Sequence, residues 1–135
     1  MRVLLLSILL LFQDEAPPLY HDVVKSAKAS DKPILLVFSG SDWCGNCIKL
    51  KANVFDQENF KALQIESFEM YTADFPRTKK AVEDRRTLDN EMLAEKFNPK
   101  GKFPLLVLLD SNQQVLKKTS KKLNSFNDFK VWLSS

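Results

Sequence analysis

The sequence has few of the residues that hold structural zinc: its 135 residues include two cysteines and one histidine. A structural zinc site usually needs four cysteine or histidine ligands. Beyond Cys44 and Cys47 only His21 is available, on a different segment, so no metal site is expected and His21 is interpreted as a surface or capping residue. Formal net charge is only +3. Because no aromatic or glycine-rich pattern accompanies the lysines, we expect no nucleic-acid binding either.

The two cysteines stand close together, in the order Cys44-Gly45-Asn46-Cys47. They follow the apolar run 33–38, so the pair falls where a strand passes into a helix, which is typical of a dithiol that opens and closes. A helix starting near Cys44 directs its free backbone N–H groups and its positive dipole end toward that sulfur. Both effects favour the thiolate, which is the nucleophilic form. Cys47 lies one turn later on the same face, where it can close the disulfide.

Two other interpretations of the pair stay open beside redox exchange. A purely structural disulfide across two intervening residues would close a very small loop and constrain little chain entropy. Two inert buried thiols are disfavoured, because Gly40-Ser41-Asp42 and the Gly45 between the cysteines predict an exposed turn. Redox exchange is therefore the favoured interpretation.

Residues 1–16 are expected to form a signal peptide or an N-terminal anchor. Arg2 supplies a positive flank and residues 3–12 an apolar stretch whose length suits a signal sequence and is short for a membrane span. The usual small residue two positions before Ala16 is missing, so an uncleaved membrane anchor stays open. We expect residues 17–135 to form one domain outside the cytoplasm, periplasmic in a bacterium and otherwise secreted.

The rest of the pattern predicts alternating helices and strands. Residues 34–38 and 105–109 are wholly apolar, which is typical of central strands covered on both faces. Periodicity predicts helices at 19–29, 44–63, 78–97 and 126–133, a potential interruption of the second helix at 56–58, and strands at 68–75 and 114–120. This order predicts an α/β fold, a three-layer α/β/α sandwich with a mixed central sheet.

Two expectations concern particular surfaces of these elements. The second helix is expected to supply its buried face through Ile48, Leu50, Val54, Phe55 and Phe60. The strand at 114–120 is expected at the sheet edge. Its lysines oppose edge-to-edge association and so favour a monomer: Lys117, Lys118, Lys121 and Lys122.

The segment Trp-Cys-Gly-Asn-Cys at 43–47, with Phe103-Pro104 ahead of a second apolar strand, resembles the thioredoxin superfamily. Gly-Ser-Asp at 40–42 and Asp-Phe-Pro-Arg at 74–77 are similar to its extracytoplasmic branch. The resemblance covers nearly the whole chain after the leader. It implies a thioredoxin-like fold for that part of the chain.

We predict a thiol–disulfide oxidoreductase, a reductase or isomerase of protein disulfides, in which Cys44 attacks and Cys47 releases the product. The resemblance implies a cis peptide before Pro104, which places that loop beside Cys44. The residues expected to bind the substrate are Trp43, Gly45, Asn46, Phe103 and Pro104.

No dissociable cofactor is expected, because the Cys44–Cys47 disulfide itself carries the electrons. The expected partners are cysteine-containing proteins or small thiols, and a redox partner that resets the pair. The alternative is a thioredoxin-like binding or chaperone module that captures cysteine-bearing clients without useful turnover.

One departure from the family pattern concerns proton transfer. Thioredoxins carry a buried acid on the strand before the active site, with a lysine partner on the next strand. Aligned on Trp43, the position of the acid falls at Phe38 and that of the lysine near Met70. Loss of both together is physically consistent, because an unpaired buried charge is costly.

Overall fold

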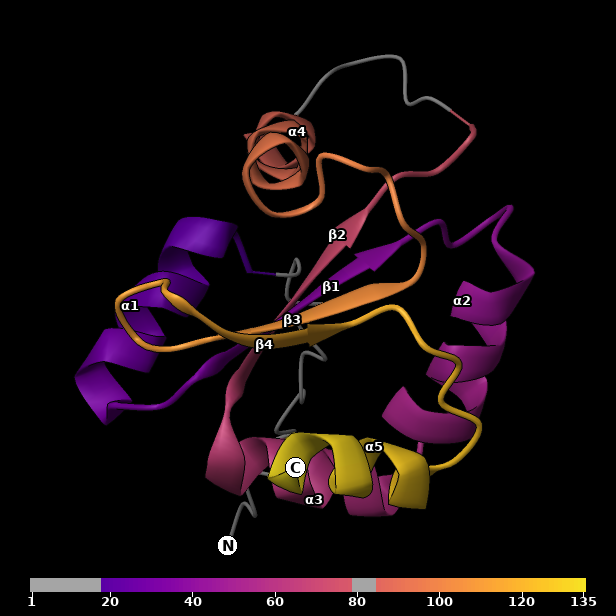
Figure 1. Ribbon diagram of the computed structural model, residues 1–135. Helices are drawn as coiled ribbons and strands as arrows, with labels where there is room; N and C mark the ends of the chain where they lie inside the picture. Colours follow the sequence, from indigo (N-terminus) through magenta and orange to yellow (C-terminus); the bar gives the residue numbers. More distant parts are fainter. Residues whose placement is uncertain (1–17, 79–84) are drawn as a thin grey trace, which may run out of the picture.

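Four strands form one sheet in the order β2-β1-β3-β4 in the computed structural model, which describes residues 18–78 and 85–135 (Figure 1). The elements are α1 (Tyr20–Ser30), β1 (Ile34–Ser39), α2 (Gly45–Leu50), the π-helical turn η1 (Lys51–Phe55), α3 (Glu58–Ser67), β2 (Glu69–Asp74), α4 (Arg85–Phe97), β3 (Leu105–Leu109), β4 (Val115–Thr119) and α5 (Phe126–Ser134). The expected leader lies outside the described residues. Within them, no helix combines the length and apolar character needed to cross a membrane.

The sheet is mixed: β1 runs parallel to β2 and antiparallel to β3, and β3 runs antiparallel to β4. All five residues of β3 and the first five of β1 are buried. Such unbroken apolar strands need cover on both faces, which only the centre of a layered sheet supplies. The expected central strands are confirmed, and β4 lies at an edge as expected.

Alternate side chains of the central strands enter two separate cores. Leu36 and Phe38 join Leu93 of α4 on one face, whereas Leu35 joins Phe129 of α5 on the other. Figure 1 shows α1 and α4 on one side of the sheet and α2, α3 and α5 on the other. The three-layer α/β/α sandwich is therefore confirmed.

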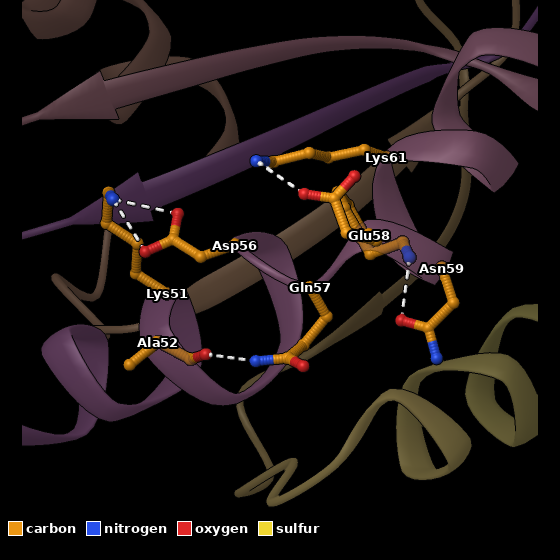
Figure 2. A network of polar contacts seen from close by, with 8 residues as sticks. Lys51, Ala52, Asp56, Gln57, Glu58, Asn59 and Lys61 are labelled. Atoms are coloured by element: carbon orange, nitrogen blue, oxygen red, sulfur yellow. Dashed lines mark hydrogen bonds and ion pairs between the residues drawn. The ribbon is translucent and has the colours of Figure 1, made fainter.

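The expected second helix is three elements, α2, η1 and α3. At the break, Lys51 Nζ contacts both carboxylate oxygens of Asp56 at 2.8 and 2.9 Å, and Gln57 Nε2 donates to the Ala52 carbonyl at 2.9 Å (Figure 2). Gln57 has an extended backbone, with φ −75° and ψ 140°, so the helix cannot continue through it. The predicted interruption is confirmed, and α3 continues beyond 63 to Ser67.

Ile48 is 49% exposed, so its predicted burial is wrong. The inward stripe of this segment passes through Cys47, Leu50 and Val54. Ile48 is turned by about 100° from Cys47 around the helix, which takes it out of that stripe.

The start expected for the fourth helix is also corrected. Thr78 is not helical, and the described helix α4 begins at Arg85; residues 79–84 lie outside the described part of the chain. A buried side chain, Asn90, connects α4 to β2: it accepts from the Tyr71 hydroxyl at 2.6 Å and donates to the Asp74 carbonyl at 3.2 Å. These bonds fix α4 against the end of β2 that adjoins the cysteines.

Candidate active site

Cys44 caps the N-terminus of α2 and is joined to Cys47 by a disulfide. Their Cα atoms lie 5.2 Å apart, and the backbone N–H of Cys47 donates to Cys44 Sγ at 3.2 Å. Cys44 is 7% exposed and Cys47 3%. A backbone N–H of the first helical turn thus donates to the Cys44 sulfur, as the sequence predicted. The same arrangement favours a negative charge on that sulfur once the disulfide is reduced.

The turn before Cys44 is attached to the end of the neighbouring strand. Ser41 donates to the Asp74 carboxylate twice, from its backbone N–H at 2.9 Å and its hydroxyl at 2.6 Å. The contact follows from the parallel register, which places Ser39 beside Asp74, so that the segments leaving β1 and β2 emerge together. Asp74 therefore anchors the turn that precedes Cys44 to the end of β2.

Asp42 makes the reciprocal attachment to the segment that follows β2. Its two carboxylate oxygens accept from the backbone N–H groups of Arg77, at 2.8 Å, and Thr78, at 3.1 Å. These two hydrogen bonds to the charged form, that of Arg77 first, lower the pKa of Asp42 below its ordinary value. Asp74 at the end of β2 thus binds the turn that follows β1, and Asp42 in that turn binds the segment that follows β2.

Trp43 occupies a position that this pair of segments creates. Its indole N–H donates to the Phe75 carbonyl at 2.7 Å, its ring packs edge to face with Phe103 at 5.4 Å between centroids, and Arg77 Cζ stands 6.0 Å from its centroid. A Cβ on Gly40 would lie 2.6 Å from the indole nitrogen, so only glycine leaves room for this ring. Trp43 remains 39% exposed beside the disulfide.

The Phe103–Pro104 peptide is cis, as the resemblance implied. The Phe103 ring packs on Trp43 and, at 5.7 Å, on Phe75. Neither its N–H nor its carbonyl has a hydrogen-bond partner within the described ranges. A main-chain donor and acceptor therefore remain free beside the cysteine turn.

The structure brings the predicted site residues together from two distant segments. Asn46, Phe103 and Pro104 line one groove, and the ring of Trp43 packs on that of Phe103. Gly45 borders open space: a Cβ added there would meet no atom within 4 Å, so sterics do not require glycine.

The contacts of Ser41, Asp42 and Asp74 are not among the sequence predictions, although their motifs carry the family resemblance. The signal was present: each motif directly follows a strand, and the ends of neighbouring parallel strands lie side by side. Identifying the contacts would have required knowing that 34–39 and 69–74 pair in parallel.

The positions carried over for the buried acid and its lysine do not face each other. Phe38 belongs to the core under α1 and α4, whereas Met70 packs in the core under α3 and α5. The β2 residue beside Phe38 is Ala73, which is fully buried as well. Phe38 instead stacks on Phe75 at 6.4 Å between ring centroids.

Residues 18–78 and 85–135 contain no cluster of three or more histidine, cysteine or acidic side chains suited to a metal ion.

The Asp42 contacts predict how the folding stability of the protein changes at acid pH. Because hydrogen bonds lower its folded pKa, Asp42 stabilises the fold above the ordinary aspartate value of about 4, and this stabilisation is lost as pH falls through the lower folded pKa. We expect Asp42→Asn to unfold at lower denaturant concentration than wild type at pH 7 and to lose less of its stability between pH 5 and pH 3. Urea midpoints at both pH values measure this. Parallel acid slopes in the two proteins would show that the contact contributes nothing.

Comparison with known proteins identifies relatives with similar sequences. The disulfide bond reductase DsbH of Chlamydia pneumoniae is 33% identical over 97 residues, which cover 72% of this chain and 57% of that protein. The thioredoxin-related protein DsbJ of the same organism is 27% identical over 95 residues, covering 70% of this chain and 27% of DsbJ. The chain thus spans little more than half of the first relative and about a quarter of the second.

Solved structures share the arrangement. A DsbH oxidoreductase matches with a TM-score of 0.76 at 26% identity, over 91% of this chain and 90% of that one. A disulphide isomerase from Xylella fastidiosa Temecula1 matches with a TM-score of 0.62 at 21% identity, over 85% and 88%, which concerns the fold alone. A family model described as thioredoxin-like matches residues 19–111. With that model spanning most of the sheet and the whole cysteine site, the chain belongs to the thioredoxin-like family.

Proposed function

We propose that the protein is a thiol–disulfide oxidoreductase that reduces or rearranges disulfides of client proteins. The observation that carries the proposal is the placement of Cys44 as N-cap of α2, with Cys47 closing on it from one turn below. The name of the relative DsbH, a disulfide bond reductase, supports the same chemistry.

The reaction is an exchange of sulfur–sulfur bonds. In the reduced protein the Cys44 thiolate attacks one sulfur of a client disulfide, forming a mixed disulfide while the other client sulfur leaves as a thiolate. The Cys47 thiolate then attacks Cys44 Sγ, which re-forms the Cys44–Cys47 bond and releases the second client thiolate. Two electrons pass to the client, its two thiolates take up protons, and a dithiol partner must reduce the pair for another cycle.

Client binding is assigned to the surface around Phe103. Its unpartnered N–H and carbonyl are suited to pairing with an extended client backbone, in the way that a free strand edge accepts another strand. Trp43 and Asn46 border this position, with Trp43 packed on the Phe103 ring. Gly45 adds no side chain that would block the approach.

The proposed place of action is outside the cytoplasm. Arg2 and the apolar residues 3–12 supply an export signal, either cleaved or kept as an anchor. Residues 17–135 then form the working domain, which we propose acts as a monomer.

The test is catalysis together with a redox potential. Wild type should accelerate reduction of insulin disulfides by a dithiol, and its pair should equilibrate with glutathione at a potential within the thioredoxin-fold range of roughly −120 to −270 mV. A protein that binds cysteine-bearing clients without accelerating their reduction, with a pair that does not exchange with glutathione, would instead be a capture module.

The reduced protein offers a second prediction, on which thiol reacts. Cys44 at the helix N-terminus should be the better nucleophile, because the dipole and free N–H groups favour its thiolate, while Cys47 is more buried. Iodoacetamide at pH 6, followed by mass spectrometry, should label Cys44 several-fold faster. Preferential labelling of Cys47 would reverse the assignment.

A further inference from the structure

A groove opens beside the cis-proline loop. Its walls come from α2, from Phe103 and Pro104, and from the segment 120–124 that links β4 to α5. Figure 1 shows that link running alongside α2. The groove therefore adjoins Phe103, the residue to which client binding is assigned above.

The charge of this groove has one sign. Lys49 of α2 and Lys122 of the β4–α5 link both line it, and their companions include the uncharged Asn46 and Asn124. No acidic side chain of the described residues lines it. The lining residue Asn124 contacts one acid, Asp128 near the start of α5, whose carboxylate accepts from the Asn124 backbone N–H at 2.8 Å.

Neither groove lysine has a structural partner. Both side chains are exposed, and among residues 18–78 and 85–135 neither makes a hydrogen bond, an ion pair or a cation–π contact. Other lysines do: Lys51 pairs with Asp56, and Lys117 donates to carbonyls at the end of α5. Two lysines without a partner in the described part of the chain line this groove, which makes it complementary to a carboxylate.

We propose that Lys49 and Lys122 select clients that carry an aspartate or glutamate within three residues of the reactive cysteine. The inference rests on the proposed function, since it needs a client strand seated against Phe103. Lys49 comes from α2 and Lys122 from the β4–α5 link, so an acidic side chain in the groove that they line is attracted by both. The carboxylate forms solvent-exposed ion pairs, which strengthen binding modestly and favour one client sequence over another.

The experiment compares short peptide disulfides that differ at one residue, glutamate, glutamine or lysine, placed on either side of the cysteine. Wild type should reduce a glutamate peptide with a kcat/KM roughly tenfold above that of its glutamine counterpart at low salt, and the ratio should shrink as salt screens the pair. Lys49→Gln and Lys122→Gln should each lower the ratio about threefold, and the double variant should bring it near one. Charge reversal at both positions should make the lysine peptide the preferred one.

The matched control is Lys25→Gln/Lys28→Gln on α1, which removes the same net charge on the opposite side of the sheet. It should keep the wild-type ratio. Reaction with 2-hydroxyethyl disulfide, which has no carboxylate, measures any change in the reactivity of Cys44 itself, and the peptide ratio is unaffected by such a change because both peptides meet the same thiolate. A wild-type ratio near one, or a ratio that survives in the double groove variant, would overturn the inference while leaving the enzyme assignment intact.

A binding measurement that involves no disulfide exchange tests the two proposals separately. Peptides with serine in place of cysteine are titrated into the oxidised protein by calorimetry, and the glutamate peptide should bind more tightly than the glutamine one. If no peptide disulfide is turned over yet this preference is present and lysine-dependent, the groove assignment stands and the oxidoreductase proposal falls. Equal affinities would overturn the groove assignment whatever the turnover.

Discussion

Cys47→Ser is expected to accumulate disulfide-linked complexes with client proteins, whereas Cys44→Ser should accumulate almost none. The attacking thiol forms the mixed disulfide, and only the resolving thiol breaks it. With Cys44 as N-cap of α2 and Cys47 one turn inside it, the serine at 47 leaves the attack intact and removes the release. Non-reducing gels of alkylation-quenched extracts, with the linked peptide identified by mass spectrometry, measure the trapped fraction.

Turnover should fall in both variants for different reasons. Loss of the nucleophile in Cys44→Ser should lower the rate of insulin disulfide reduction roughly 10³-fold or more, as removal of a covalent nucleophile does in other enzymes. Cys47→Ser should complete the first attack and then stop, which frees one client thiol per protein molecule and leaves the client linked to Cys44. The double serine variant provides the blank for non-covalent association. Equal trapping by the two single variants would indicate passive thiol capture, the binding-module alternative.

The sheet was predictable from the sequence because its centre is encoded locally. Residues 34–38 and 105–109 have no polar alternation, and only a strand covered on both faces accommodates such a run. The cysteine pair and Phe103-Pro104 were predictable for a similar reason, since short motifs carry them.

The attachments around the site were not predictable, because they depend on register. Ser41 reaches Asp74 only because β1 and β2 pair in parallel with Ser39 beside Asp74. Lys122 joins Lys49 in one groove across more than seventy residues of chain, a proximity that no local pattern encodes. Ile48 was misassigned because the apolar stripe was followed by residue type and not by angle around the helix.

Phe38→Asp is expected to destabilise the fold by about 4 kcal/mol or more at pH 7. Phe38 is fully buried, stacks on Phe75, and has only apolar neighbours on the adjacent strands, Ala73 on β2 and Leu105 on β3. The substitution removes an aromatic side chain from the core and places a carboxylate where no described cation is opposite it. In a thioredoxin with an acid at this position, a lysine offsets that charge; here Met70 faces the other core.

The pH dependence identifies the charge as the cause. Burial without a partner raises the folded pKa of an introduced carboxyl above its unfolded value of about 4. Its protonated form is then the one the fold tolerates, so the variant is least destabilised near pH 4 and loses stability as pH rises through the folded pKa. Urea unfolding from pH 4 to pH 8 should show that slope in Phe38→Asp and not in Phe38→Asn, which has nearly the same shape without the charge.

Phe38→Leu completes the series as the apolar control, with an expected loss of about 1 to 2 kcal/mol that does not vary with pH. Exchange activity is informative in the same proteins. If the wild type needs no buried acid for proton transfer, Phe38→Leu should retain most of the wild-type exchange rate. The folded fraction of Phe38→Asp should then exchange disulfides no faster than wild type. A Phe38→Asp protein as stable as Phe38→Asn at every pH would mean that water or a cation reaches this position. The core around Phe38 would then not be the dry, apolar environment that its complete burial indicates.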